Sequence, residues 1–150
     1  MQIKTMVDEL TMGNYIVDCM RQVIVRVIGI EPRGCKVQNL GGEGKYALRA
    51  AEMLPVPLSE RILQRNGWRA TNDEALLFPE MGEHSDVYYL NGSHYGEPVR
   101  LEYDLVSFQL KVGEPNGNFR WARFRLNSVH ELQNALKAID FKELADNFKI

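Results

Sequence analysis

The chain has few cysteines and no long apolar run, and each absence excludes a class of protein. Its two cysteines, Cys19 and Cys35, do not make the disulfide framework of a small secreted domain, and no zinc-site spacing is present. No stretch approaches the roughly 18 apolar residues of a membrane span. The segment from Met1 to Leu10 lacks the basic and apolar regions of a signal peptide. We therefore expect a cytoplasmic protein with reduced cysteines.

Signatures of the common catalytic sites are also missing. The sequence contains neither a G-x-S-x-G nucleophile elbow nor a G-x-G-x-x-G dinucleotide loop. Its glycine-rich segment, Gly41-Gly42-Glu43-Gly44, lacks the Lys-Ser/Thr pair of a phosphate-binding loop. The sequence therefore predicts a protein that is not an enzyme and that uses no cofactor and no metal.

The histidines leave an enzymatic alternative open. His84 lies in a polar segment with four potential metal ligands, but their spacing matches no recognised site. His130 is the second residue of a helix, where the positive end of the helix dipole disfavours an imidazolium. A hydrolase or metal enzyme that uses His84 or His130 with carboxylates is the weakest of three functional hypotheses. His94 lies in a turn-like segment.

The overall composition is that of an ordinary globular protein. Of 150 residues, 45% are hydrophobic and 25% are charged, which argues against global disorder. The net charge of −2 predicts no strong overall field toward nucleic acid or membranes, although charge can still gather locally.

Residues 1–54 read as an N-terminal β-meander. Three segments with many β-branched residues, 14–19, 22–30 and 35–40, are separated by turn residues, which is typical of antiparallel strands. Residues 45–48 are a fourth strand, or else the alanine-rich stretch that continues to Met53 is helical. Short strands of this kind are compatible with an SH3-like barrel.

Residues 55–150 read as a second, α+β subdomain, unless the two parts form one integrated domain. After the break at Pro55-Val56-Pro57, Ser59 caps a short linking helix that ends at Asn66-Gly67. Segments 74–78 and 86–90 look like strands, and 99–112 with 118–126 form a hairpin. The predicted fold is α+β and rich in antiparallel strands.

The hairpin register follows from its apolar pattern. Pairing Phe108 with Ala122 collects Val106, Leu110, Val112, Phe124 and Leu126 on one face. A shift by one residue mixes the faces and sets Lys111 against Arg120, an unfavourable like-charge pair. The first register is therefore predicted.

The C-terminal part begins with a clear helix start. Ser128 and Glu131 form an S-x-x-E capping box, in which each side chain satisfies an N–H group of the first turn. Val129, Leu132, Leu136 and Ile139 then fall on one apolar stripe. A second short stripe follows near the end of the chain. C-terminal helices therefore complete the predicted fold.

Three short motifs occur in order along the chain. They are Met12-Gly13-Asn14-Tyr15-Ile16, then Pro55-Val56-Pro57-Leu58-Ser59-Glu60 leading to Asn66-Gly67-Trp68, and finally Val129-His130-Glu131-Leu132-Gln133-Asn134. With this ordered set, the chain resembles in outline an uncharacterised family of small proteins found in Bacteroidetes genomes and their phages. Members often have Gln where Glu131 stands, and the tail toward Ile150 departs further from them. The resemblance implies an intracellular, phage- or mobile-element-associated setting and supplies no activity.

The outer face of the hairpin is the candidate binding surface. In the predicted register, aromatic and basic side chains project together there: Tyr103, Lys111, Phe119, Trp121, Arg123 and Arg125, beside Ser107 and Gln109. Such residues anchor protein interfaces, and they also stack on bases and contact phosphates. The structural alternative is a strand buried on both faces, with Arg123 and Arg125 paired to Glu102 or Asp104.

The leading functional hypothesis is a small intracellular binding or accessory protein with a protein partner. The second is a nucleic-acid-binding protein that uses the same β surface. Neither the identity of the partner nor the oligomeric state follows from the sequence.

Overall fold

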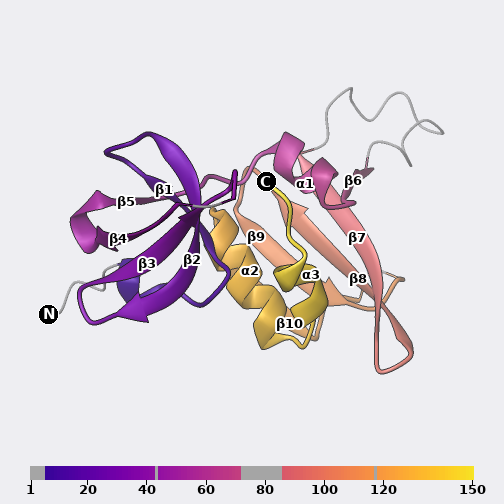
Figure 1. The fold of residues 1–150 in the computed structure, drawn as a ribbon. Coiled ribbons are helices and arrows are strands. Elements are labelled where there is room, and N and C mark those ends of the chain that lie inside the picture. Colours follow the sequence, from indigo (N-terminus) through magenta and orange to yellow (C-terminus); the bar gives the residue numbers. More distant parts are fainter. Residues whose placement is uncertain (1–5, 43, 72–85, 117) are drawn as a thin grey trace, which may run out of the picture. The chain divides into compact units, whose positions relative to one another are not determined.

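The computed structural model describes residues 6–42, 44–71, 86–116 and 118–150 (Figure 1). Contacts between Cα atoms divide the chain into two compact units. Unit 1 comprises residues 1–57 and 128–147, and unit 2 comprises residues 58–127 and 148–150. Each unit contains one antiparallel sheet of five strands, so the fold is α+β and rich in antiparallel strands, as the sequence predicts.

The first described element of unit 1 is the 3₁₀ helix η1 (Met6–Glu9), and a β-meander follows it. In chain order, its strands are β1 (Tyr15–Asp18), β2 (Val23–Glu31), β3 (Gly34–Asn39), β4 (Lys45–Arg49) and β5 (Met53–Pro55). The sheet order is β4-β3-β2-β1-β5, with the 3₁₀ helix η2 (Ala50–Glu52) just before β5. In this order β5 pairs with β1, so the first strand lies inside the sheet. The structure resolves the alternative after β4, because only a single helical turn, η2, forms there.

The core of unit 1 comes from alternate positions of these strands. Ile16, Val25 and Val37 are fully buried. Val27, Cys35, Leu48 and Met53 belong to the same cluster. Burial raises the pKa of the Cys35 thiol to about 11, so that group stays protonated at neutral pH.

Asp18 is a buried carboxylate at the end of β1. It accepts hydrogen bonds from the Tyr46 hydroxyl at 2.6 Å and from Arg21 Nη1 at 3.0 Å, and the Met20 and Arg21 amides bond its other oxygen. Burial alone would raise the pKa of Asp18. These hydrogen bonds outweigh burial and lower it.

A lowered carboxyl pKa makes part of the stability of unit 1 depend on pH. The stabilising contribution of Asp18 is complete above its ordinary pKa and is lost as pH falls through the lowered value. We predict that Asp18→Asn reduces the loss of unfolding free energy between about pH 5 and pH 2. Urea unfolding across that range measures this. The control is Asp146→Asn at an exposed site of the same unit, and an equal pH dependence in both variants would contradict the prediction.

Helices α2 (Val129–Ala138) and α3 (Lys142–Asp146) belong to unit 1. The sequence instead predicts both helices as part of the subdomain of residues 55–150, because it does not show which segments the polar side chains of α2 contact. Gln133, which is 1% exposed, accepts a hydrogen bond from the Tyr15 amide at 3.0 Å and donates to the Gly13 carbonyl at 3.0 Å. The neighbouring Asn134 donates to the Glu9 carbonyl at 2.7 Å. These bonds attach α2 to the segment that enters β1.

The capping box at Ser128 differs from its prediction. Ser128 is the N-cap, but its hydroxyl accepts no hydrogen bond from a backbone amide of the first turn. It donates to the Glu131 carboxylate at 2.6 Å instead. The hydroxyl donates to Glu131 because an ionised carboxylate is a stronger acceptor than a neutral group. The predicted cap at Ser59 is confirmed, since its hydroxyl accepts from the Ile62 amide at 3.3 Å.

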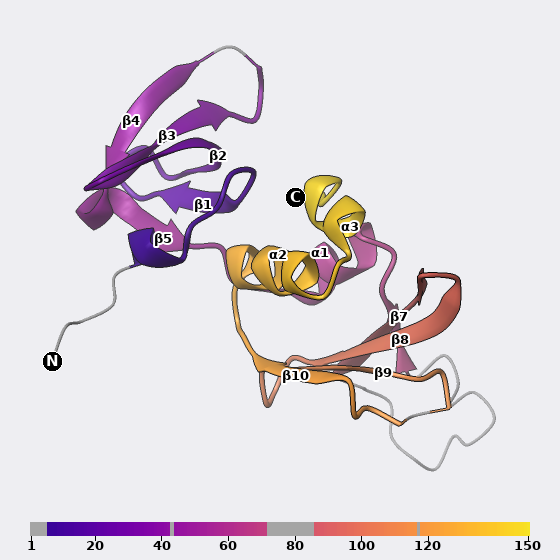
Figure 2. The ribbon, with the colours of Figure 1, turned by 90° about the horizontal axis from the view of Figure 1, so that it is seen from below.

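In its described residues, unit 2 contains the second sheet and one short helix. Its elements are α1 (Glu60–Arg65), β6 (Arg69–Ala70), β7 (Val87–His94), β8 (Glu97–Asp104), β9 (Gln109–Gly113) and β10 (Ala122–Arg125). The sheet order is β10-β9-β8-β7-β6, and Figure 2 shows α1 on one side of this sheet. The strand predicted at residues 74–78 lies outside the described residues. No helix in the described ranges is long and apolar enough to span a membrane.

The strand predicted at residues 99–112 is interrupted, so part of the hairpin prediction is wrong. Asp104 Oδ1 accepts bonds from the Val106 amide at 2.8 Å and the Ser107 amide at 3.4 Å, which forms a tight turn. Phe108 then takes a left-handed conformation with φ of 60°. Val106 and Phe108, expected on the apolar face, are 67% and 38% exposed at this turn.

Candidate binding surface

The outer face of the unit 2 sheet is polar and basic. On the inner face, Leu101, Tyr103 and Leu110 are fully buried. On the outer face, one row of directly opposed residues crosses all five strands: Arg69, Tyr89, Glu102, Lys111 and Arg123. Side chains opposed in this way project from the same side of a sheet.

The observed register between β9 and β10 differs from the predicted one by four residues. Ala122 lies opposite Val112, and Phe124 lies opposite Leu110. An even shift preserves the faces, so Arg123 and Arg125 still project outward. It also places Arg123 directly opposite Lys111, a like-charge neighbour of the kind the prediction sought to avoid.

The structure brings together three of the six predicted site residues. Lys111, Arg123 and Arg125 share the outer face, and both arginines are exposed. Trp121 lies just before β10 and is 48% exposed, while Phe119 is half-buried outside the strand. Tyr103 does not join them. It is fully buried on the inner face and donates its hydroxyl to the Leu126 carbonyl at 2.7 Å, because its strand alternation places it opposite Leu110.

Trp121, Arg123 and Arg125 follow one another along the edge of the sheet, and we call these three residues the Trp–Arg edge. The Trp121 amide donates to the Val112 carbonyl at 3.2 Å, which holds the residue beside β9. The His94 ring lies 6.3 Å from the Trp121 ring in an edge-to-face arrangement. Sequence reasoning missed this contact, because His94 comes from the distant β7–β8 turn.

The backbone N–H and C=O groups of Arg123 and Arg125 point away from β9. The Leu126 amide donates to the Phe108 carbonyl at 2.8 Å, which makes this pair hydrogen-bonded. Alternation along an antiparallel ladder then makes Phe124 and Ala122 the bonded positions of β10. The N–H and C=O groups of Arg123 and Arg125 therefore lie on the free side of the strand, where the described residues supply no partner.

Among the described residues, some charged side chains of the outer face form ion pairs and others do not. Arg100 donates to the Glu102 carboxylate at 3.0 Å and stacks 4.3 Å from the centre of the Tyr89 ring. Burial would raise the pKa of Asp104, but hydrogen bonds from Val106 and Ser107, together with Lys111, lower it. Within the described residues, neither Arg123 nor Arg125 forms an ion pair. Across the described part of the chain, these two cations at the sheet edge therefore have no ion-pair partner.

A small hollow opens on the same face. It is lined by Val87, Glu102, Asp104, Ser107, Gln109 and Lys111 and holds about 60 Å³. Small-molecule sites typically occupy several hundred Å³. This hollow is therefore too small to enclose a typical small substrate.

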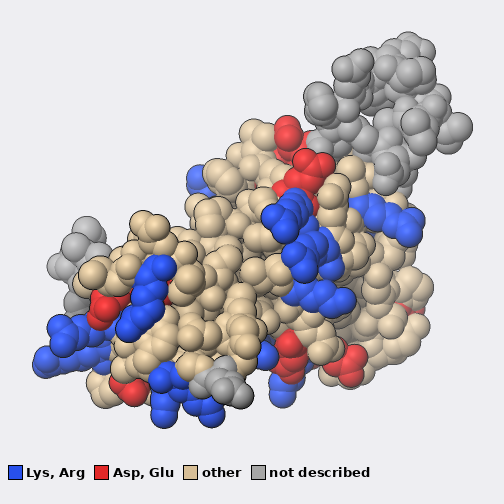
Figure 3. Space-filling model, turned by 45° about the horizontal axis from the view of Figure 1, so that its top comes forward, with Lys and Arg blue, Asp and Glu red and all other residues tan. Residues whose placement is uncertain are grey.

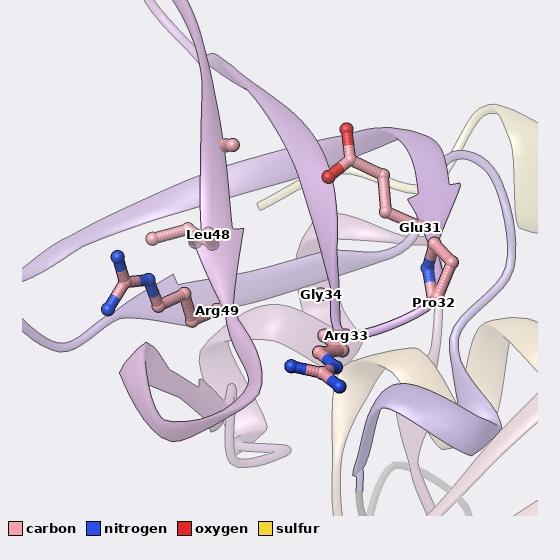
Figure 4. Close-up of a pocket in the computed structure, with 7 residues that line it drawn as sticks. Glu31, Pro32, Arg33, Gly34, Leu48 and Arg49 are labelled. Carbon is pink, nitrogen blue, oxygen red and sulfur yellow. The ribbon is translucent and has the colours of Figure 1, made fainter.

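A pocket of about 420 Å³ lies in unit 1, at the turn between β2 and β3. Figure 4 shows the Glu31 carboxylate well separated from the guanidinium groups of Arg33 and Arg49. Its remaining lining residues are Pro32, Gly34, Ala47 and Leu48. The lining contains neither histidine nor cysteine, so it offers no pairing of a nucleophile with an imidazole base.

His130 has a structural environment. The ring is 2% exposed, its Nδ1 lies 3.2 Å from the Ser128 hydroxyl, and its Nε2 lies 3.3 Å from Glu9 Oε2. Both ring nitrogens therefore have partners within the protein. The other histidine of the enzymatic alternative, His84, lies outside the described residues. Among the described residues, no three His, Cys, Asp or Glu side chains are grouped to hold a metal ion.

Charged groups of both signs lie next to one another on the face drawn in Figure 3. This mixture agrees with the small net charge of −2. Compared with known proteins, the chain matches no family model, no curated protein and no solved structure.

Proposed function

We propose that this chain is a small intracellular accessory protein that binds another protein through the Trp–Arg edge. The observation that carries the proposal is the exposure of Arg123 and Arg125 on the edge strand β10 and of Trp121 just before it, with no ion pair to either arginine among the described residues. Trp and Arg are the residue types most often found as anchors of protein interfaces.

The surroundings of the edge support a protein partner. Phe108, whose carbonyl bonds to the end of β10, is 38% exposed, and Val106 in the same turn is 67% exposed. Aromatic and apolar side chains beside arginines are typical of the centre of a protein interface. The resemblance to proteins of Bacteroidetes and their phages favours a phage- or mobile-element-associated partner in the cytoplasm.

Affinity capture from cells that naturally produce the chain tests this proposal. We expect the double variant R123E/R125E to capture far less of the partner than the unchanged chain does. The reason is that two cations of the proposed interface become anions facing the partner. The matched control is R61E/R65E, which reverses two exposed arginines on α1. Equal capture by both double variants would contradict the proposal.

A nucleic-acid partner is the second candidate function. It is favoured by the row across the outer face, in which Arg69, Lys111 and Arg123 outnumber the single acidic residue, Glu102. Phosphate contacts of this kind weaken steeply as salt rises. A gel shift with single-stranded oligonucleotides at low and high salt separates this function from the first, since a protein partner requires no such binding.

A further inference from the structure

The free side of β10 has the geometry of a strand that accepts a further strand. Arg123 and Arg125 present their backbone N–H and C=O groups on that side, and no other described segment pairs with them. Unpaired groups at a sheet edge form a template for an extended peptide, which binds through main-chain hydrogen bonds. The short length of β10 would allow about two such pairs of bonds.

Charge decides which strand fits. In a pairing with a second copy of β10, arginines would lie opposite arginines on the outer face, and like charges directly opposed are destabilising. Lys111 stands opposite Arg123 on the other side and adds to the positive charge. An incoming strand with carboxylates on this face would meet opposite charges instead.

The inner face selects a different residue type. Ala122 and Phe124 alternate with the arginines and point toward the core side, where both are half-buried. An adjacent strand can extend this apolar surface if its alternate residues are apolar. The complementary segment therefore alternates acidic and apolar residues.

We propose that the Trp–Arg edge binds an extended acidic segment of its protein partner, which adds as a sixth strand beside β10. This inference rests on the proposed function and names the chemistry of the partner. Carboxylates of the segment pair with Arg123 and Arg125, its apolar residues lie beside Phe124, and Trp121 covers one end of the added strand.

The probe is a blocked peptide of alternating Glu and Val, about eight residues long, added to the full ¹⁵N-labelled chain. We expect slower hydrogen exchange at the Arg123 and Arg125 amides and no change at Phe124, whose amide is already bonded to β9. A peptide with Lys in place of Glu should bind roughly tenfold more weakly, because two favourable cross-strand pairs become repulsive. A Glu-Val peptide that is N-methylated at alternate residues should lose the protection altogether.

Charge reversal provides the matched test. R123E/R125E should prefer the Lys-Val peptide, while R61E/R65E on α1 should keep the preference for Glu-Val. Three results would overturn the inference: no protection at Arg123 and Arg125 by the Glu-Val peptide, equal binding of its N-methylated form, or displacement of the Glu-Val peptide by oligothymidylate that contacts the outer face without protecting these amides. If the peptide fails while R123E/R125E still abolishes partner capture, the added strand is wrong and the proposed function stands. If capture itself survives the reversal, the proposed function fails.

Discussion

Gln133→Leu is expected to destabilise unit 1 by about 3 kcal/mol, because it removes a buried amide and leaves its partners unsatisfied. The Gln133 side chain is 1% exposed, and its Oε1 accepts a hydrogen bond from the Tyr15 amide at 3.0 Å. Its Nε2 donates to the carbonyls of Gly13 at 3.0 Å and Ala145 at 3.4 Å. Leucine is no smaller than glutamine, so the substitution opens no cavity, and the loss reports mainly on hydrogen bonding.

Urea unfolding followed by circular dichroism measures this loss. The control is Gln64→Leu on α1, where the glutamine is exposed and donates to Glu60 at 3.3 Å. A surface change of that kind typically alters stability by less than about 0.5 kcal/mol. A loss below about 1 kcal/mol for Gln133→Leu would show that the buried network contributes less than its partners indicate.

Gly34→Ala should be comparably damaging, for a steric reason. Gly34 is the first residue of β3, and a Cβ atom there would overlap the carbonyl oxygen of Leu48 on β4. The main chain of Arg49 is also within close reach, so no flexible side chain can move aside. We expect a loss of about 3 kcal/mol, at the upper end of what overpacking costs.

Gly41→Ala is the matched control, because a Cβ atom at Gly41 meets nothing within 4 Å. It should leave the free energy of unfolding nearly unchanged. If Gly34→Ala is too unstable to purify as a fully folded protein, hydrogen exchange in a mixture of folded and unfolded chains can still show which amides lose protection. The steric explanation requires that the loss centres on the paired strands β3 and β4. Equal stability of the two variants would contradict it.

Local patterns in the sequence predict most of the elements. The strands of unit 1 and the short helix after Ser59 follow from β-branched runs, turn residues and a capping hydroxyl, all of which act over a few residues. The turn at Asp104 had a readable signal as well, since Asp and Ser at its ends commonly bond the amides inside a turn. The apolar pattern of Val106 and Phe108 concealed it.

The predicted register between β9 and β10 is wrong because it was inferred from two strands alone. Avoiding a like-charge pair is sound for an isolated hairpin, yet in the structure Lys111 lies opposite Arg123 on one side and opposite Glu102 on the other. Glu102 lies on β8, which the turn at Asp104 separates from β9, and its ion pair is with Arg100. The register prediction treats residues 99–112 as one strand and therefore does not place a third strand beside β9.

The polar residues of α2 illustrate the same limit. The helix itself follows from its periodicity, but the partners of Gln133 and Asn134 lie near β1, about 120 residues away in the chain. Thr11 donates to Asn134 Oδ1 at 2.7 Å, and Lys137 donates to the Met12 carbonyl at 2.8 Å. These polar side chains therefore anchor the helix within unit 1.

The proposal that β10 contacts a protein partner can be tested most directly by site-specific photo-crosslinking. A photoreactive amino acid at position 123 should form a cross-link to an acidic segment of one protein in the native cells, whereas the same group at position 61 on α1 should not. Prior addition of the Glu-Val peptide should suppress that cross-link in an extract. Equal cross-linking from both positions, or cross-linking from position 123 to nucleic acid alone, would contradict the proposal.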